Sequence, residues 1–408
     1  MYLAGDNRNS LVKNFNSTPE IIPFVKAALG FAAGVGFLLA ATVAHAQAPL
    51  TGLPTTVEPT GSTQQLAPAF RGAPPRSLRI TPAPGSVAPP DADSIRFVLS
   101  GISVVGQTVY KIAEFEEFYA ELVGTAVNLT AIFEIARKIE AKYRNNGYIM
   151  TRAVVPVQTV SNNIFKIEVI EGFIDKVTIF GDAGPVRSLI ERYLSKISPN
   201  TEGEAPGPTN IRDIERYLLL VNDLPGITAR GIPRRLTGAD AGKGATELVV
   251  EVKRKSLGLS ANINNRGSRF AGPWGSEVLG VANSFTEFGE RVSVSLVTAL
   301  DARNLTEQRS AKIDLEGRIG SEGLSVHAYT SFSPSRPGFT LRALQVRARV
   351  VQAGFGLNYP IIRTHNVTLR AGIEFDYTNS FVDALGARLN DDRLRVLRLN
   401  SLLDFNDS

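Results

Sequence analysis

The sequence predicts two α+β modules of order β-α-α-β-β, followed by an antiparallel transmembrane β-barrel. Three observations predict this fold class: the same order of elements occurs twice between residues 94 and 255, apolar and polar residues alternate from residue 257 onward, and an export signal precedes both regions. Barrels of the outer membrane alternate lipid-facing apolar and lumen-facing polar residues along strands of about 9–11 residues. The sequence therefore places the protein in a membrane.

The composition excludes several classes of protein. The 408 residues include no cysteine, which excludes disulfide bonds and thiolate metal sites. The formal net charge is +5, but the basic residues are spread along the chain among 39 acidic residues. Nucleic-acid-binding proteins usually gather their basic residues on one face. We therefore expect no nucleic-acid partner.

Residues 1–46 are predicted to be a signal peptide, and residues 47–93 a proline-rich linker. Lys26 precedes an uncharged run from Ala27 to Ala44, and Ala44-His45-Ala46 fits a cleavage site. A membrane-anchoring helix is the alternative, because the run approaches the length of about 18 residues that spans a bilayer. Ten of the 23 prolines lie in the linker, which predicts an extended segment without a core. A proline-rich protein ligand is the alternative there.

Residues 94–172 are predicted to form the first module. A strand bent at Gly101 is expected over residues 96–105, followed by helices over 113–122 and 129–145 and strands over 148–158 and 164–171. The second helix has apolar residues at helical spacing, and they are Ile132, Ile135, Ala136, Ile139 and Tyr143.

Residues 173–255 are predicted to repeat this order. A strand is expected over 174–179, helices over 185–197 and 209–223, and strands over 226–232 and 246–254. Two modules of about 80 residues with one order of elements form an internal repeat. Each is amphipathic enough to pack a small sheet against its helices.

Residues 256–408 are predicted to be the first part of a barrel. One face of its strands is apolar, and the other carries Lys312, Asp314, Glu316, Arg318, Arg370, Glu374 and Asp376. A Lys or Arg facing lipid at mid-bilayer costs about 2–4 kcal/mol, so we expect the charged face to line a lumen. A solvated inner face without a specific role, or a soluble sheet with one wet face, are the alternatives. Eight strands are expected, over 257–266, 276–286, 290–302, 309–320, 323–333, 344–359, 366–379 and 393–405.

Five segments, in this order, resemble the two-partner-secretion transporters of the ShlB/FhaC/HecB family. Gly147–Pro156 is similar to the edge strand of the first POTRA (polypeptide-transport-associated) domain of that family, and Glu171–Val177 to the join between its two POTRA domains. Asn264–Trp274 is similar to the first barrel hairpin, and Ser335–Gly338 and Asp391–Val396 to later barrel segments. The resemblance covers residues 94–405.

The resemblance implies an outer-membrane transporter of type V secretion, with POTRA domains in the periplasm. Its partner would be a secreted TpsA-type exoprotein similar to a haemolysin or adhesin, exported without ATP. No cofactor and no enzymatic activity are implied. The family barrel has about sixteen strands and a Val-Arg-Gly-Tyr motif, whereas this sequence supplies about eight strands and lacks Arg-Gly-Tyr. We therefore expect a chain truncated within the barrel.

Partner capture is expected by β-augmentation, in which an extended client adds a strand to an exposed sheet edge. The candidate edge is strand 148–158, where Pro156 is tolerated because an edge strand can lose a donor. Helix 129–145 would form the other wall of a groove. The candidate residues are Tyr148, Ile149, Thr151, Ala153 and Val155 on the strand and Ile135, Ile139 and Tyr143 on the helix. Plain sheet structure and helix–sheet core are the alternatives.

Patterns typical of enzymes are weak. Gly238–Gly244 is one residue shorter than a phosphate-binding loop and has glycine in place of the required Ser or Thr. His327 and His365 have too few partners for a zinc site or a nucleophile–base pair, so we expect no catalytic and no metal-ligating residue. Three other functions stay open: an outer-membrane assembly insertase of the same superfamily, a passive porin, and a soluble periplasmic binding protein.

Overall fold

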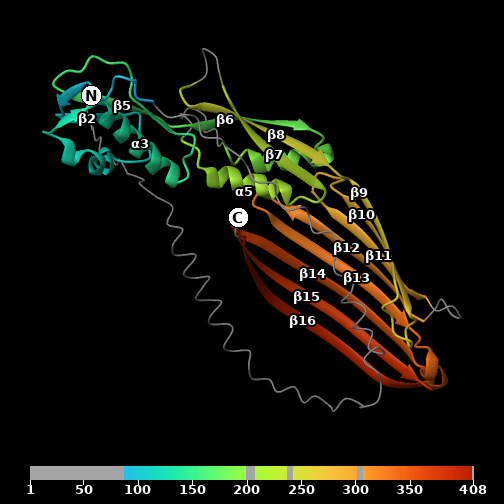
Figure 1. The fold of residues 1–408 in the computed structure, drawn as a ribbon. Coiled ribbons are helices and arrows are strands. Elements are labelled where there is room, and N and C mark those ends of the chain that lie inside the picture. Colours follow the sequence, from blue (N-terminus) through green and yellow to red (C-terminus); the bar gives the residue numbers. More distant parts are fainter. Residues whose placement is uncertain (1–86, 199–206, 237–241, 301–306, 407–408) are drawn as a thin grey trace, which may run out of the picture. The chain divides into compact units, whose positions relative to one another are not determined.

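The computed structural model describes residues 87–198, 207–236, 242–300 and 307–406. The predicted signal peptide and most of the predicted linker lie outside these residues, as does part of the glycine-rich segment 238–244. In the described part, no helix has both the length and the apolar character that crossing a membrane requires. Figure 1 shows the described elements, which form two small modules and one large sheet.

The first module packs helices against a three-stranded sheet of order β2-β5-β4. β2 runs parallel to β5 and β4 antiparallel to it, while β1 pairs separately with β3. Ile132, Ile139 and Ile167 are fully buried between helix and sheet. The elements are β1 (Arg96–Val98), β2 (Gly101–Val105), η2 (Ile112–Phe118), η3 (Ala120–Leu122), β3 (Ala126–Asn128), α3 (Leu129–Asn145), β4 (Arg152–Val154) and β5 (Ile164–Ile170).

Helix α3 has the bounds that the sequence predicts. The Asn128 side chain accepts a hydrogen bond from the Ala131 amide at 3.1 Å and so caps the first turn. At the other end Gly147 takes a φ of +94°, and the Tyr148 amide donates to the Tyr143 carbonyl at 2.9 Å. A residue in the left-handed region is a common helix stop, and glycine adopts it without steric cost.

Two predictions for the start of this module are wrong. Residues 96–105 form two strands in different sheets, because Leu99 bonds through both its amide and its carbonyl to the chain at Gly124 and Thr125. The chain therefore leaves one sheet at Leu99 and enters the other at Gly101. Residues 113–122 form two 3-10 helices instead of an α-helix, and the tighter turn still buries Phe115 completely.

The predicted strand 148–158 is also wrong in length, since only Arg152–Val154 pair with β5 as a strand. The Thr151 amide bonds to the Tyr148 carbonyl at 3.1 Å, so a turn precedes the strand. Pro156 then removes a donor from the ladder. Beyond it, the Gln158 side chain takes the place of a strand, donating to the Lys166 carbonyl at 2.9 Å and accepting from the Lys166 amide at 2.8 Å.

The second module repeats the first with a larger core. Its sheet has the order β6-β8-β7, again with one parallel and one antiparallel pair. Val186, Ile190, Tyr193, Ile214 and Leu248 are fully buried in its core. The elements are β6 (Phe173–Gly181), η4 (Gly184–Val186), α4 (Arg187–Leu194), α5 (Ile211–Asn222), β7 (Ile227–Arg235) and β8 (Ala245–Arg254). The repeat that the sequence predicts is present in the structure.

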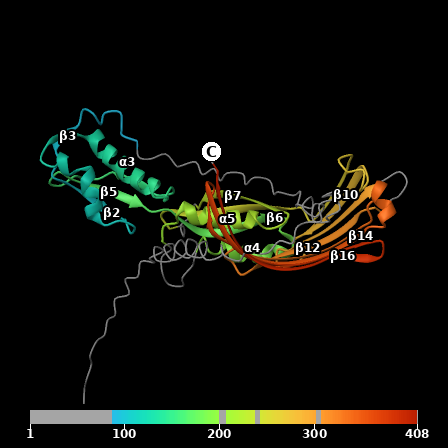
Figure 2. The ribbon, with the colours of Figure 1, turned by 90° about the horizontal axis from the view of Figure 1, so that it is seen from below.

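The rest of the described chain forms one antiparallel sheet of eight strands in sequence order. All eight predicted strands are found, although β14 and β16 begin several residues from where we expected them. Figure 2 shows that the sheet is curved, and its two edges are β9 and β16. The strands are β9 (Leu257–Asn264), β10 (Trp274–Asn283), β11 (Arg291–Leu300), β12 (Arg309–Ile319), β13 (Leu324–Ser335), β14 (Arg347–Arg363), β15 (Val367–Ala384) and β16 (Ala387–Phe405), with η5 (Phe339–Leu344) between β13 and β14.

The substitution Ile139→Ala tests whether this side chain belongs to the core of the first module. Removing a fully buried isoleucine leaves a cavity and costs about 2–5 kcal/mol, so residues 97–172 should open more readily. Denaturant-dependent hydrogen exchange of this module in the full chain measures the effect. Ile112→Ala is the control, because Ile112 is half exposed and should change stability by less than about 0.5 kcal/mol. Equal effects of the two substitutions would contradict the core assignment.

Candidate partner-binding edge and polar face

The strand β4 stands last in the order β2-β5-β4 of the described strands. Among the described strands it pairs only with β5. The Ala153 amide donates to Glu140 Oε2 of α3 at 3.4 Å, and Glu140 Oε1 accepts from Arg144 at 2.6 Å. Glu140 is buried, with 6% of its surface exposed. A helix side chain therefore contacts the backbone of the edge strand.

The predicted binding residues are not all placed at an accessible surface. Ile135, Ile139 and Tyr143 are at most 1% exposed, so they form helix–sheet core and do not line an open groove. That part of the prediction is corrected, because the strand packs directly on this face of the helix. Thr151 and Ala153 are buried, and Val155 packs against the same core. Tyr148 and Ile149 precede the strand, and both are partly buried.

Glu171 holds the end of the first module together. Its carboxylate accepts hydrogen bonds from the Thr108 amide at 2.7 Å, the Val109 amide at 3.1 Å and the Tyr143 hydroxyl at 2.6 Å, and also from the Thr108 hydroxyl. Burial acts to raise the pKa of Glu171, but these donors outweigh it and hold the pKa below its ordinary value. Burial and the bond to Glu171 raise the pKa of the Tyr143 hydroxyl.

The two modules are joined by hydrogen bonds and by an ion pair. The Asn210 side chain donates to the Asn146 carbonyl at 2.9 Å, and the Ile211 amide donates to the Gly147 carbonyl at 2.9 Å. Lys243 of the second module forms an ion pair with Glu168 of the first at 2.6 Å. Lys243 belongs to the glycine-rich segment 238–244, so the described part of that segment contacts the first module. The N-terminus of α5 therefore packs on the C-terminus of α3.

The strand register places the seven predicted lumen residues on one face of the eight-stranded sheet, the polar face. In one row Glu316 of β12 lies opposite His327 of β13, and Glu374 of β15 lies opposite Arg398 of β16, with Gly356 of β14 between them. A Cβ atom at Gly356 would come within 2.3 Å of the His327 ring, so glycine makes room for this row. The next row contains Asp314 and Asp376, and Lys312, Arg318 and Arg370 lie on the same face.

The charges on the polar face are paired across strands and along them. Lys312 bonds to Asp314 at 2.7 Å, and Arg318 to Glu316 at 2.6 Å. His327 lies 3.6 Å from Glu374. Asp376 accepts a hydrogen bond from the Tyr329 hydroxyl and contacts Arg398. The described residues contain no group of three His, Asp or Glu side chains that could hold a metal ion.

The opposite face of the sheet, the apolar face, is exposed and lacks charge over most of its height. Leu315, Phe355, Phe375 and Leu397 lie in one row across β12 to β16, each 44–64% exposed. On β15 the apolar residues run from Val367 to Tyr377, close to the span of about 9–11 residues that a tilted membrane strand needs. Exposed apolar surface of this extent fits lipid better than water.

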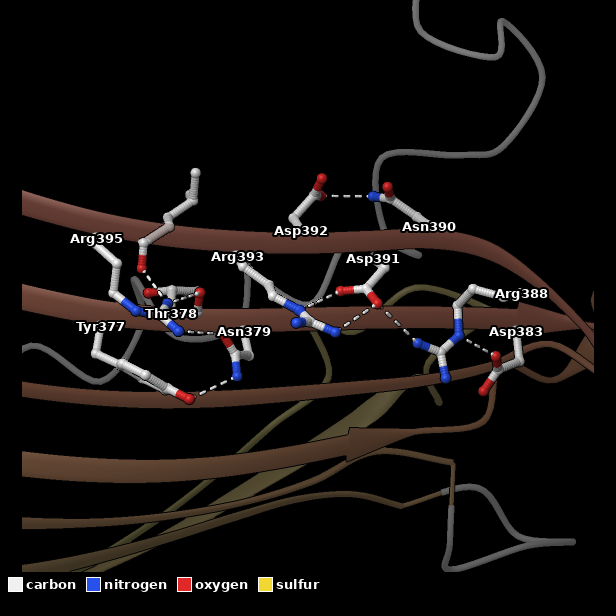
Figure 3. Close-up of polar contacts among 11 residues, drawn as sticks. Tyr377, Thr378, Asn379, Asp383, Arg388, Asn390, Asp391, Asp392, Arg393 and Arg395 are labelled. Carbon is white, nitrogen blue, oxygen red and sulfur yellow. Dashed lines mark hydrogen bonds and ion pairs between the residues drawn. The ribbon is translucent and has the colours of Figure 1, made fainter.

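The hairpin of β15 and β16 becomes polar beyond Tyr377, as Figure 3 shows. Arg393 binds Asp391 through two bonds of 3.0 and 3.1 Å, and Arg388 binds Asp383 at 2.6 Å. The Arg395 guanidinium lies 3.6 Å from the centre of the Tyr377 ring. Exposed ion pairs require water, and tyrosines gather where a membrane meets water. The apolar band therefore ends at Tyr377.

The other end of the sheet contacts the second module. Asp223, the residue that follows α5, accepts two bonds of 2.8 Å from Arg363 of β14, and its carbonyl accepts from Arg318 at 2.7 Å. Ser284, in the turn after β10, donates to the Pro225 carbonyl at 2.6 Å. Both arginines meet the carbonyl end of α5, where the helix dipole favours cations. The second module is thus fixed at the turns opposite the polar hairpin.

The sequence did not indicate three residues whose side chains make structural contacts. Glu140 holds the amide of the edge strand, Gln158 extends the ladder beyond Pro156, and Asp223 binds two arginines of the sheet. The spacing of Glu140 and Arg144 by four positions indicates a helix ion pair, and Pro156 indicates a short strand. No local pattern identifies Asp223, because its partners lie 95 and 140 positions away along the chain.

Residues 97–172 match the family of POTRA domains of the ShlB type. The chain carries a ShlB-type POTRA domain. This confirms the resemblance to two-partner-secretion transporters that the sequence indicated. The match covers the first module, which holds both the edge strand β4 and Glu171.

Curated relatives are similar over a larger part of the chain. The heme/hemopexin transporter protein HuxB of Haemophilus influenzae strain 86-028NP is 22% identical over 290 residues, which cover 70% of this chain and 49% of HuxB. The outer membrane transporter CdiB of Escherichia coli is 30% identical over 147 residues, 36% of this chain and 23% of that protein. This chain thus spans about half the length of HuxB. These relatives are transporters, and they confirm the predicted outer-membrane location.

Two solved structures share the fold. CdiB from Escherichia coli matches with a TM-score of 0.62 at 19% identity, over 87% of this chain and 65% of that chain. CdiB from Acinetobacter baumannii matches with a TM-score of 0.53 at 13% identity, over 86% and 65%. The predicted fold class, POTRA modules followed by a barrel-type antiparallel sheet, is confirmed. In the described residues this sheet has eight strands and is not closed on itself.

Replacing Glu171 by Gln should destabilise the first POTRA domain by about 1–2 kcal/mol at neutral pH, since hydrogen bonds to a charged group are lost. The folded-state pKa lies below the ordinary value of 4.5, so the stabilisation is present above pH 4.5 and is lost as pH falls through the folded pKa. Urea unfolding followed from pH 7 to pH 3 should therefore show a smaller acid-induced loss in the variant. Glu134→Gln, at an exposed site on α3, is the control. A pH profile identical to that of the wild type would refute the role of Glu171.

Placing a lysine on the apolar face should impair insertion. Phe375→Lys is expected to cost about 2–4 kcal/mol in a bilayer, measured as unfolding free energy in lipid vesicles. Gln352→Lys adds the same charge on the polar face and should change stability by less than about 1 kcal/mol. Equal effects at the two positions would show that the apolar face does not meet lipid.

Proposed function

We propose that this protein is the outer-membrane translocator of a two-partner, type V secretion system. The observation that carries the proposal is a ShlB-type POTRA domain in one chain with a sheet that has one lipid-compatible face and one polar face. A porin would need no periplasmic modules, and a soluble binding protein would not expose the apolar face. The relatives named as transporters support the same conclusion.

In this proposal each of the five predicted segments has its own role. Residues 1–46 direct export, 47–93 link, 94–172 and 173–255 are the two periplasmic POTRA domains, and 256–408 contribute the first strands of the barrel. The partner is a secreted TpsA-type exoprotein, similar to a haemolysin or adhesin. It is transported without covalent chemistry, so the protein needs no cofactor and is not an enzyme.

Capture begins when an extended segment of the exoprotein adds to β4. Main-chain hydrogen bonds supply the affinity in such a pairing, so it does not require the buried side chains of Thr151 and Ala153 to be accessible. The side chains of Arg152 and Val154 alternate with these buried residues and are partly exposed. They lie on the face of the sheet opposite α3, where they would contact side chains of a client strand added at the edge.

The polar face then supports passage of an unfolded chain. Its charges are of both signs and are largely paired, as in the contacts of Lys312 with Asp314 and of Arg318 with Glu316. An extended client therefore meets neither a continuous apolar surface nor a field of one sign. We assign Lys312, Asp314, Glu316, Arg318, Arg370, Glu374 and Asp376 to the wall of the translocation path.

Cysteine cross-linking tests the proposal cleanly because the chain has no cysteine of its own. Val154→Cys on β4 should form a disulfide with cysteines placed in the TpsA-type exoprotein, when its export is stalled. Ser103→Cys is the matched control, since it is exposed on β2 at the opposite edge of the same sheet. Cross-links at Ser103 but not at Val154, or none at either position, would refute capture at β4.

A further inference from the structure

We propose that Arg347 and Arg349 of β14 bind the phosphate of a lipid headgroup in the outer leaflet of the membrane. This inference goes beyond the proposed function, because it concerns the lipid around the sheet and not the exported partner. It rests on the place of the two arginines, on the charges around them and on the apolar side chains beside them.

The two arginines lie on the apolar face of the sheet, at one end of β14. Ala348 and Val350, which alternate with them, are at most 1% exposed, so these two side chains point to the other face. Arg347 and Arg349 are both exposed, and the alternation places them on the same face as Phe355. Their guanidinium groups therefore project from the side of the sheet that meets lipid.

This end of β14 is held by packing on its other face. Ala348 belongs to a buried cluster with Val346, with Val382 of β15 and with Leu341 of η5. The arginines are thus carried by a packed strand end and not by a free loop.

The same end of the sheet faces the outer leaflet. β9 follows directly after β8 of the periplasmic second module, so β9 begins at the periplasmic end. The strands from β9 to β16 pair in sequence order and antiparallel, so β14 begins at the opposite end. Arg347 is the first residue of β14, which places both arginines at the outer end.

The apolar residues of β13 and β14 end directly beside the arginines. Val351, two positions further along β14, is 37% exposed, and its partner Phe332 on β13 is 48% exposed. Two positions along a strand span about 7 Å. The two charges therefore lie just beyond the last apolar side chains, at the level where headgroups adjoin the hydrocarbon core.

The acids on this part of the face are already paired, as Figure 3 shows. Asp383 lies opposite Arg347 in the strand register, but it binds Arg388 at 2.6 Å. Asp391 binds Arg393 at 3.0 Å and lies 3.5 Å from Arg388. Both carboxylates are thus engaged by arginines of β16.

Two positive charges are left without a carboxylate partner. In the part of the chain that the structure describes, neither Arg347 nor Arg349 forms an ion pair. The neighbours of Arg349 across the strands are Pro334 on β13 and Phe381 on β15, and neither carries a charge. An anion from outside the chain therefore meets no competitor at these two side chains.

A phosphorylated lipid fits this surface in both of its parts. A guanidinium group presents a planar fork of N–H donors that binds phosphate through two parallel bonds, and basic residues at a membrane surface attract anionic headgroups. The acyl chains of the same molecule would cover Val351 and Phe332. Free phosphate has no part that could do so, and an acidic peptide would leave these side chains without an apolar partner.

The experiment measures binding of lipid A, a phosphorylated glycolipid, to the full chain in detergent by native mass spectrometry. Arg347→Gln combined with Arg349→Gln should weaken binding roughly thirtyfold, the factor that corresponds to two basic residues at an anionic surface. Arg266→Gln combined with Arg269→Gln is the matched control. It removes the same charge from two exposed positions in the loop between β9 and β10, at the same end of the sheet, and should leave the affinity nearly unchanged.

Dephosphorylated lipid A and inorganic phosphate identify what is recognised. We expect dephosphorylated lipid A to bind the wild type weakly, and inorganic phosphate at the concentration of lipid A not to displace it. Equal affinity of the wild type for the two lipids, or an equal loss in the control variant, overturns the inference. Displacement by inorganic phosphate alone shows a site for free phosphate and overturns it as well.

A second variant keeps the test decisive if the Gln variant does not fold. Arg347→Lys combined with Arg349→Lys keeps both charges but loses the two-bond fork, so lipid A should bind several-fold less tightly. Affinity equal to that of the wild type would then refute the site.

The outcomes also separate this inference from the proposed function. Weaker lipid A binding by the Gln variant, with unchanged cross-linking of the exoprotein at Val154→Cys, supports the lipid site and leaves capture intact. Unchanged lipid A binding, with the same cross-links, removes the lipid site alone.

Discussion

The parity of strand pairing is the constraint on which the large sheet depends. Side chains alternate between faces along a strand, so every pair of strands must be aligned with apolar opposite apolar. The register keeps Leu315, Phe355, Phe375 and Leu397 on one face over four strand pairings, although the β14–β15 and β15–β16 ladders each contain one irregularity. A slip by one residue would turn the charged face of a strand toward lipid. The exposed apolar face and the polar face of the sheet both follow from this alignment.

Helix α5 connects the parts of the periplasmic region to the sheet through its two ends. At its start Asn210 bonds to the end of α3 in the first POTRA domain, and after its end Asp223 bonds to Arg318 and Arg363 of the sheet. A helix of twelve residues spans about 18 Å. The contacts use helix termini, where backbone groups lack partners within the helix. The two ends of α5 thus contact α3 of the first module and arginines of the eight-stranded sheet.

In the proposed function, the strand β4 has to bind a client without promoting aggregation. An extended client requires an accessible strand edge, but such an edge also attracts unwanted strands. The short length of β4, the proline that follows it and the contact of Glu140 with Ala153 limit this hazard. The three helix residues that we predicted for a groove wall are core instead, which places Glu140, at the rim of that core, next to the strand.

Elements that arise from local periodicity could be predicted from the sequence. Alternation of two residues predicted all eight strands, a repeat of 3.6 residues predicted the bounds of α3, and the recurrence of one element order predicted two modules. These patterns are visible in a sequence because each depends on neighbours within one turn or one strand. The polar residues of the sheet could be assigned to one face for the same reason.

The pairing of strands and the contacts between side chains of distant segments depend on the tertiary fold. The separation of β1 from β2, the shortness of β4, and the contacts of Glu140, Glu171 and Asp223 all depend on residues distant in the chain. Pairing partners and buried polar contacts are chosen by packing, since burial removes competing water and favours the arrangement that pairs most donors and acceptors. Local sequence patterns therefore do not predict these contacts.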